Sequence, residues 1–179
     1  GVVKLNTWNQ HRISTLVVKK LFGTITNKKI AILGFAFKAN TNDTRESSAI
    51  PICKDLLEEG AFLYIHDPVV DPKQIAKDLG KDEADGNNYA GEYNISSEGK
   101  WVFRKDLNAV CFGADAIIIL TDWEEYFKLD WSSIAQIMRK PSWVFDSRSV
   151  VKKEVSLNVF CIFIVLGVAC IFPLLIINS

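Results

Sequence analysis

The stretch KKIAILGFAFKANTNDTRESSAI, residues 28–50, decides the fold class. Its apolar run Ile30–Leu33 leads into Gly34, as in the first buried strand of a nucleotide-binding βαβ unit. A dinucleotide-binding loop would continue as G-x-G-x-x-G, but Ala36 and Ala39 stand where the second and third glycines belong. The stretch instead contains two cations, Lys38 and Arg45. Together with a helix N-terminus, they could hold a diphosphate.

A helix is expected to follow this strand and to end at Gly60. Asp43, with Glu46 three residues later, has the spacing of a capping box and predicts a helix start there. Pro51 then marks either a kink or the first turn of a helix that starts a little later. The alternative to a ligand site is a structural βαβ unit, in which Lys38 and Arg45 merely pair with Asp43 and Glu46.

Strand and helix patterns alternate along the rest of the chain. Further strands are predicted at 61–66, 116–120 and 142–146, helices at 8–22, 71–79 and 131–140, and a surface loop at 80–100. This order predicts an α/β fold, a Rossmann-like parallel sheet with helices on both faces. Ligands of such sheets bind beyond the carboxyl ends of the strands. Those ends are predicted at residues 34–38, 66–67, 121–123 and 146–148, with Asp67 placed to meet a ribose.

The composition excludes several functional classes. The 179 residues carry 21 basic and 21 acidic side chains, so no overall field attracts nucleic acid. The four cysteines are scattered, and only two histidines accompany them, which argues against a metal site. Scattered cysteines in a chain of this length also indicate a reducing compartment, so we expect a cytoplasmic protein.

Four segments together resemble a known family. KKIAILGFAFKANTNDTRESSAI, followed in order by HDP, AIIILTDWEEYFKLD and FDSR, resembles the C-terminal UDP-binding domain of the UDP-glucose/GDP-mannose dehydrogenase family, in the form of the eukaryotic UDP-glucose 6-dehydrogenases. The resemblance covers about residues 1–151. KLNTWNQHR looks like the end of the family's long central helix, which links its domains and forms its dimer core.

The resemblance implies an NAD-dependent, four-electron oxidoreductase that makes UDP-glucuronate from UDP-glucose, and a homo-oligomer in the full enzyme. It implies that Phe37 and Lys38 contact the sugar nucleotide, that Arg148 contacts substrate, and that Arg45 reaches toward NAD. The family's catalytic cysteine, which carries a thiohemiacetal and then a thioester, and its glycine-rich NAD domain have no counterpart in this sequence. Cys53 and Cys111 are expected to be buried hydrophobes, so no catalytic residue is assigned and the fragment alone is expected to be inactive.

Two other functions remain open. One is a non-catalytic module that binds UDP-sugars or dimerises with a full enzyme. The other is a dehydrogenase of another nucleotide sugar, such as GDP-mannose. The sequence also departs from the family pattern, with Asn42 and Ser147 at positions where the family usually has glycine. Asn42 suits a left-handed backbone better than most residues, and Ser147 could stiffen or shift the turn that aims Arg148.

The chain is expected to divide into three parts: residues 1–26, the end of the central helix and a linker; 27–154, the UDP-sugar-binding domain; and 155–179, a hydrophobic tail. Residues 155–177 carry no charge and follow Lys152 and Lys153, so they are long enough to span a bilayer as a membrane anchor. We favour instead an artefact of the gene model, such as translated intron sequence. A buried pair of strands is a third interpretation.

Overall fold

The fold was analysed in a computed structural model that describes residues 2–85, 98–152, 162–165 and 174–176. Its helices are α1 (Val2–Lys20), α2 (Ala49–Glu58), α3 (Pro72–Leu79), α4 (Leu107–Cys111), α5 (Glu124–Phe127) and α6 (Trp131–Ile137). Its strands are β1 (Lys29–Leu33), β2 (Phe62–His66), β3 (Lys100–Phe103), β4 (Ala116–Ile119), β5 (Trp143–Asp146), β6 (Ile162–Val165) and β7 (Leu174–Ile176).

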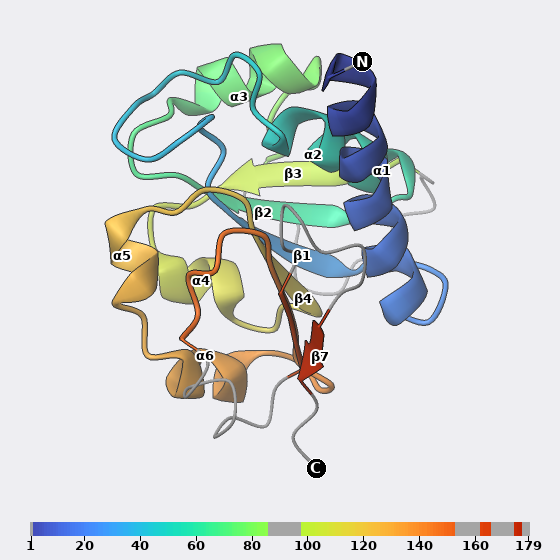
Figure 1. The fold of residues 1–179 in the computed structure, drawn as a ribbon, viewed down its shortest axis with the longest axis vertical. Coiled ribbons are helices and arrows are strands. Elements are labelled where there is room, and N and C mark those ends of the chain that lie inside the picture. Colours follow the sequence, from blue (N-terminus) through green and yellow to red (C-terminus); the bar gives the residue numbers. More distant parts are fainter. Residues whose placement is uncertain (1, 86–97, 153–161, 166–173, 177–179) are drawn as a thin grey trace.

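The strands form one sheet in the order β3-β2-β1-β4-β5-β6-β7. Every pair is parallel except β6 with β7. Helices α1, α2 and α3 cover one face of the sheet, and α4 and α6 cover the other (Figure 1). The predicted α/β fold with helices on both faces is therefore confirmed.

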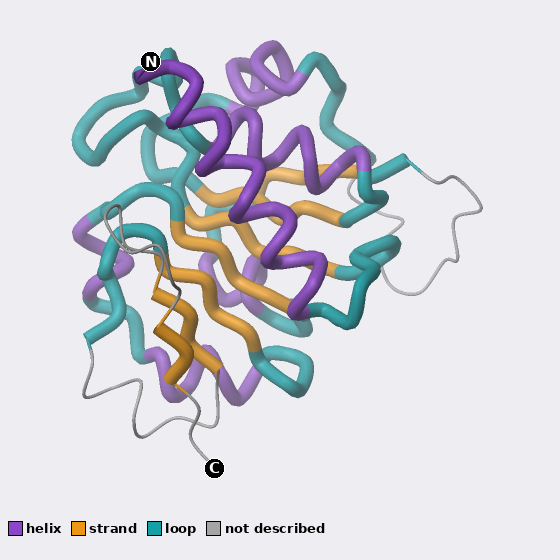
Figure 2. The backbone as a smooth tube through the Cα atoms, turned by 45° about the vertical axis from the view of Figure 1, so that its right-hand side comes forward, coloured by secondary structure: helices purple, strands orange, loops and turns teal. Residues whose placement is uncertain are grey.

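The core lies between the central strands and these two helical layers. All four residues of β4 are buried, as are the last four of β1, because each of these strands faces a helical layer on both sides. Helix α1 runs beside α2 on one face (Figure 2). The Asp55 carboxylate of α2 accepts a bond of 2.6 Å from the Ser14 hydroxyl and lies 2.8 Å from the His11 ring, which fastens the two helices together.

The predicted start of α2 at Asp43 is wrong. The helix begins at Ala49, after Ser48, and Glu46 has a left-handed backbone with φ of 63°. Pro51 explains the later start, because it lies in the first turn, where an N–H has no partner within the helix. In a helix begun at Asp43, Pro51 would have removed an internal hydrogen bond. The interpretation of Pro51 as a first-turn residue is confirmed.

Strand β3 was missed by the sequence analysis, which predicted a loop up to Lys100. The strand pairs in parallel with β2 at the edge of the sheet. The backbone N–H of Ala84 donates to the Trp101 carbonyl at 3.0 Å, and the Glu83 carboxylate accepts from the Phe103 N–H at 2.7 Å. The chain before β3 thus covers part of its open edge. Residues 86–97 of the predicted loop lie outside the described residues.

The hydrophobic tail is described only at β6 and β7, which extend the sheet beyond β5. These two pieces are strands, as in the third interpretation of the tail, and the rest of 155–179 lies outside the described residues. Among the residues that the structure describes, no helix is both long and apolar enough to be a candidate membrane span.

Candidate functional site

The four predicted strand ends meet at one edge of the sheet. Strands β2, β1, β4 and β5 are parallel neighbours in that order, so the residues that follow them share an edge. The strand order reverses between β1 and β4, which is where sheets of this type place their ligands. Figure 1 shows the loop after β1 and helix α5 beyond the ends of the strands at this edge.

The turn directly after β1 binds an internal carboxylate. The backbone N–H groups of Phe35 and Ala36 donate to one oxygen of Asp67 at 2.8 and 3.0 Å, and the Trp123 indole N–H reaches the same oxygen at 3.2 Å. The other oxygen accepts from the backbone N–H groups of Val69 and Val70, each at 2.9 Å. Asp67 therefore ties together the ends of three strands.

The carbonyl groups of the same turn are also bonded within the protein. The Ser47 hydroxyl donates to the Phe35 carbonyl at 2.7 Å, and the Thr121 hydroxyl donates to the Ala36 carbonyl at 2.8 Å. Phe35 and Ala36 are buried. The turn that cradles a diphosphate in dinucleotide-binding proteins has no free backbone donor left at these two residues, so it does not fit the diphosphate of NAD.

Gly34 allows the loops after β1 and β4 to approach this closely. Its φ is 93°, and a Cβ atom at this position would lie 2.4 Å from the Thr121 Cβ and 2.7 Å from the Thr121 backbone nitrogen. The remaining glycine of the incomplete dinucleotide motif thus serves close packing between two strand ends rather than approach to a ligand.

The expected ribose contact of Asp67 is wrong. Its carboxylate is 3% exposed and accepts five hydrogen bonds, so it is not available to a sugar hydroxyl. Spacing along the chain placed Asp67 at the correct strand end. The donors that bind its carboxylate come from three segments, 35–36, 69–70 and 123, that are far from one another in sequence. The organising roles of Thr121 and Trp123 were missed for the same reason, and their place after a strand was the only available signal.

Phe37 and Lys38 are the first residues after β1 that project outward. The Phe37 N–H donates to the Asp43 carbonyl at 2.8 Å, which closes the loop. Phe37 itself is 46% exposed. Lys38 is exposed and, among the described residues, makes no hydrogen bond or ion pair. An apolar ring and an unpaired cation therefore adjoin at the end of β1.

Arg45 pairs with Asp43. The two guanidinium contacts are 3.0 and 2.8 Å, and the Arg45 side chain is 88% exposed. Hydrogen bonds from Arg45, with its charge and that of Lys38, lower the pKa of Asp43 to about 2. The alternative to a ligand site was that Lys38 and Arg45 pair with Asp43 and Glu46. This is confirmed for Arg45, whereas in the described part of the chain Lys38 pairs with neither Asp43 nor Glu46. Arg45 would have to leave Asp43 to bind an anion fully.

Arg148 lies in the turn after β5 and reaches across the end of β4. Its backbone N–H donates to the Asp146 carboxylate at 2.9 Å, and its Nε donates to the Leu120 carbonyl at 2.8 Å. The Arg148 guanidinium is therefore fixed through its Nε, and within the described part of the chain its two Nη groups have no partner. They remain available to an anion.

Of the two departures from the family pattern, Ser147 stiffens its turn, as one of the two expectations for it had it, whereas Asn42 does not adopt the expected left-handed backbone. Ser147 has no left-handed backbone, and its hydroxyl donates to the Ile119 carbonyl at 2.6 Å, which fixes the turn of Arg148 to β4. Asn42 is not left-handed either; Asn40, with φ of 62°, and Glu46 are the left-handed residues of the β1 loop.

His66, at the end of β2, belongs to a polar cluster with Tyr126 and Glu125 of α5. Its Nδ1 lies 2.8 Å from the Tyr126 hydroxyl and its Nε2 lies 3.6 Å from the Glu125 carboxylate. Burial lowers the pKa of His66, while burial and the nearby Asp67 charge raise that of Glu125. His66 and Tyr126 of this cluster are buried, whereas the Glu125 side chain is 45% exposed.

The described cysteines are not reactive groups. Cys53 and Cys111 are free and buried, as predicted, and burial raises the pKa of both thiols, that of Cys111 to about 12. No group of metal-ligating side chains is present among the described residues. The edge can bind through cations, an aromatic ring and hydrogen bonds, but none of these groups is a nucleophile.

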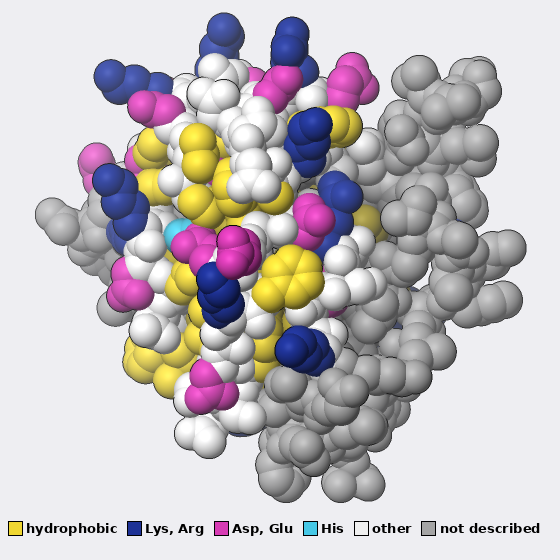
Figure 3. All heavy atoms as spheres, turned by 60° about the vertical axis from the view of Figure 1, so that its left-hand side comes forward, with side chains coloured by type: hydrophobic (Ala, Val, Ile, Leu, Met, Phe, Trp, Pro, Cys, Tyr) yellow, Lys and Arg dark blue, Asp and Glu magenta, His cyan; other side chains and the backbone are white. Residues whose placement is uncertain are grey.

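Figure 3 shows the surface from the side on which these loops lie, with Lys and Arg side chains set among hydrophobic patches and a few acidic groups. This mixture suits a ligand with both negative charge and flat, weakly polar rings. An exposed lysine, an outward arginine fork and a half-exposed phenylalanine provide both kinds of contact.

Comparison of the sequence with those of known proteins identifies a family and several relatives. Residues 31–153 match the sequence model of the UDP-glucose/GDP-mannose dehydrogenase family, UDP binding domain. The UDP-glucose 6-dehydrogenase of Drosophila melanogaster is 39% identical over 153 residues, 86% of this chain and 31% of that protein. The enzyme of that name from Rattus norvegicus is 41% identical over 149 residues, 83% of this chain and 29% of that protein.

Solved structures with this fold include a UDP-glucose dehydrogenase from Pyrobaculum islandicum, with a TM-score of 0.61 and 27% identity over 86% of this chain and 29% of that one. An NDP-N-acetyl-D-galactosaminuronic acid dehydrogenase from Methanosarcina mazei has a TM-score of 0.63 at 19% identity, over 90% of this chain and 29% of that one, and supports the fold alone. The chain spans less than a third of the curated relatives that it matches.

Proposed function

This chain belongs to the UDP-glucose/GDP-mannose dehydrogenase family, and we propose that it supplies the sugar-nucleotide-binding part of an NAD-dependent oxidoreductase that converts UDP-glucose to UDP-glucuronate. The observation that carries the proposal is the turn after β1. Its backbone groups are bonded to Asp67, Ser47 and Thr121, so a diphosphate must be held by the outward side chains of neighbouring residues.

The proposed substrate contacts are Phe37, Lys38 and Arg148. Strands β1 and β5 flank β4, and adjacent strands lie about 4.8 Å apart, so the turns that carry these residues start about 10 Å from one another. That span suits a diphosphate with its sugar. Lys38 and Arg148 would neutralise the phosphates from two sides, and the Phe37 ring would pack against a flat or apolar part of the ligand.

Arg45 is the one residue of this chain that we propose to act on the cofactor side, where it would reach NAD after leaving Asp43. The hydride chemistry itself belongs to parts of the relatives that this chain does not match. Oxidation of the sugar C6 alcohol to a carboxylate removes two hydrides, which two NAD molecules accept, and takes its second oxygen from water. The two described cysteines are buried and supply no nucleophile to that reaction.

The remaining parts of the proposal concern assembly and location. Residues 1–26 would be the end of the helix that links the family's domains, 27–154 the UDP-sugar-binding domain, and the full enzyme a homo-oligomer. The free cysteines Cys53 and Cys111 support a cytoplasmic location, since disulfides are rare there.

Lys38→Ala is expected to weaken binding of UDP-glucose by about tenfold or more, the value of one charge-assisted hydrogen bond. The fold should be unaffected, because Lys38 is exposed and bonds to no other described residue. Isothermal titration calorimetry of the 179-residue chain with UDP-glucose measures the effect.

Lys73→Ala is the matched control, because Lys73 is an exposed lysine on α3 whose removal changes the net charge equally. Equal affinity of the wild type and Lys38→Ala would remove Lys38 from the site. Tighter binding of GDP-mannose than of UDP-glucose by the wild type would instead reassign the substrate within the family.

A further inference from the structure

A cavity lies on the face of the sheet that α4 and α6 cover, away from the strand-end loops. Its volume is about 560 Å3, within the range of small-molecule sites. It opens to solvent and is lined by residues of β1, β2, α4 and α6 and of the segments that follow β3 and α4, chiefly Lys29, Tyr64, Arg104, Asn108, Phe112 and Ile137. None of these residues belongs to the proposed sugar-nucleotide site.

Two cations converge on one aromatic ring at the base of this cavity. The Lys29 ammonium lies 3.7 Å from the centre of the Tyr64 ring, and the Arg104 guanidinium carbon lies 5.9 Å from it. Burial lowers the pKa of Lys29 to about 8, and the positive charge of Arg104 adds to that effect. No carboxylate lines the cavity among the described residues. A bound anion would offset the repulsion between these two cations.

The two cations have different roles. Lys29 is held within the protein, because its ammonium donates to the backbone carbonyls of Ala109 at 2.9 Å and Phe112 at 2.7 Å. Arg104 donates from one terminal nitrogen to the Phe103 carbonyl at 2.7 Å and lies 3.8 Å from the Glu83 carboxylate. Its Nε and second terminal nitrogen have no partner in the described part of the chain. Arg104 therefore retains donors for a ligand, while Lys29 supplies charge.

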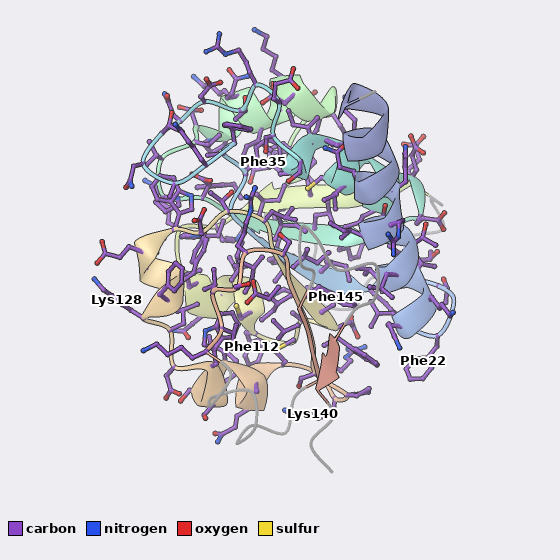
Figure 4. All side chains as sticks on the ribbon, viewed as in Figure 1. Phe22, Phe35, Phe112, Lys128, Lys140 and Phe145 are labelled. Atoms are coloured by element: carbon purple, nitrogen blue, oxygen red, sulfur yellow. The ribbon has the colours of Figure 1, made fainter. Side chains whose placement is uncertain are left out.

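The other side of the cavity is flat and apolar. Phe112 is 67% exposed, and Figure 4 shows it between α4 and α6. Ile137 of α6 lines the same side, and the Gly113 N–H donates to its carbonyl at 2.7 Å, which holds the Phe112 segment against α6. On the polar side, the exposed Asn108 lines the cavity together with Arg104.

We propose that this cavity binds a small carboxylate that carries an aromatic ring. The carboxylate pairs with the Arg104 guanidinium and with the Asn108 amide, because a guanidinium fork matches two carboxylate oxygens. The ring packs against Phe112 and Ile137, near the Tyr64 ring. This assignment does not depend on the proposed sugar-nucleotide function, since the two sites share no residue.

The test is a titration of the 15N-labelled 179-residue chain with indole-3-acetate, followed by amide chemical shifts. We expect saturable shifts at Arg104, Asn108, Phe112 and Ile137, and much weaker ones with the uncharged analogue indole-3-ethanol. Arg104→Gln is expected to weaken binding of indole-3-acetate at least tenfold. Phe112→Ala should weaken it as well without unfolding the chain, because it removes only an exposed side chain and leaves the carbonyl that Lys29 binds.

Lys73→Gln removes an equal charge from α3, on the opposite face of the sheet, and should leave the affinity unchanged. Three results would overturn the proposal: no shifts with either probe at millimolar concentration, equal binding of the uncharged analogue, or equal affinity in Arg104→Gln and the wild type. Thermal unfolding of each variant excludes loss of the fold as the reason for weaker binding.

Discussion

Asp67→Ala is expected to destabilise the protein by about 3–5 kcal/mol, the usual cost of removing one partner from a buried charged network. The carboxylate accepts five N–H groups in the structure, from Phe35, Ala36, Val69, Val70 and Trp123. An alanine leaves these donors without their acceptor at a site that is 3% exposed. Urea unfolding followed by circular dichroism measures the difference.

Asp71→Ala is the matched control for this substitution. Asp71 is an exposed aspartate four residues later, and its carboxylate accepts a single bond of 2.7 Å, from the Lys73 N–H at the start of α3. Loss of such a helix cap costs about 1 kcal/mol. Equal destabilisation by the two substitutions would mean that Asp67 does not organise the strand ends.

Gly34→Ala is expected to destabilise the protein by about 3–4 kcal/mol, through the sum of two separate effects. A left-handed backbone costs an L-residue about 1–2 kcal/mol, and an overpacked contact adds about 1–3 kcal/mol. The added Cβ would lie 2.4 Å from the Cβ and 2.7 Å from the backbone nitrogen of Thr121, so movement of the Thr121 side chain alone cannot relieve it.

Gly113→Ala separates these two effects. Its φ is 65°, but a Cβ there meets no atom within 4 Å, so only the backbone cost of about 1–2 kcal/mol remains. The denaturation midpoints of the wild type and both variants give the comparison. A loss in Gly34→Ala no larger than in Gly113→Ala would show that the contact with Thr121 is not close.

Most of the fold followed from local patterns in the sequence. The apolar runs of β1, β2, β4 and β5 predicted buried parallel strands, and Asp71 with Gly80 marked both ends of α3. Strand β3 was missed because its four residues begin with the charged Lys100 and are followed by Arg104 and Lys105, and because its pairing with β2 depends on residues far away in sequence. Short α5 carried no periodic signal of its own.

The site was predictable in position but not in its internal bonding. Strand ends placed Lys38 and Arg148 at one edge, but the same reasoning assigned Asp67 to a ribose, and the capping-box spacing with Glu46 assigned Asp43 to a helix cap. In the structure, both carboxylates instead accept hydrogen bonds from the protein: Asp67 from N–H groups at three strand ends, and Asp43 from Arg45. The partners of Asp67 come from tertiary contacts, which spacing along the chain does not encode, whereas Asp43 pairs with a residue only two positions away.

The central claim is that side chains at the ends of β1 and β5, and not backbone amides of a glycine-rich turn, hold a sugar nucleotide. Titration of the 15N-labelled chain with UDP-glucose, followed by amide chemical shifts, tests it most directly. The account predicts saturable shifts concentrated in residues 37–45 and 147–149. Absence of shifts in both segments at millimolar UDP-glucose, or shifts confined to other parts of the sheet, would contradict it.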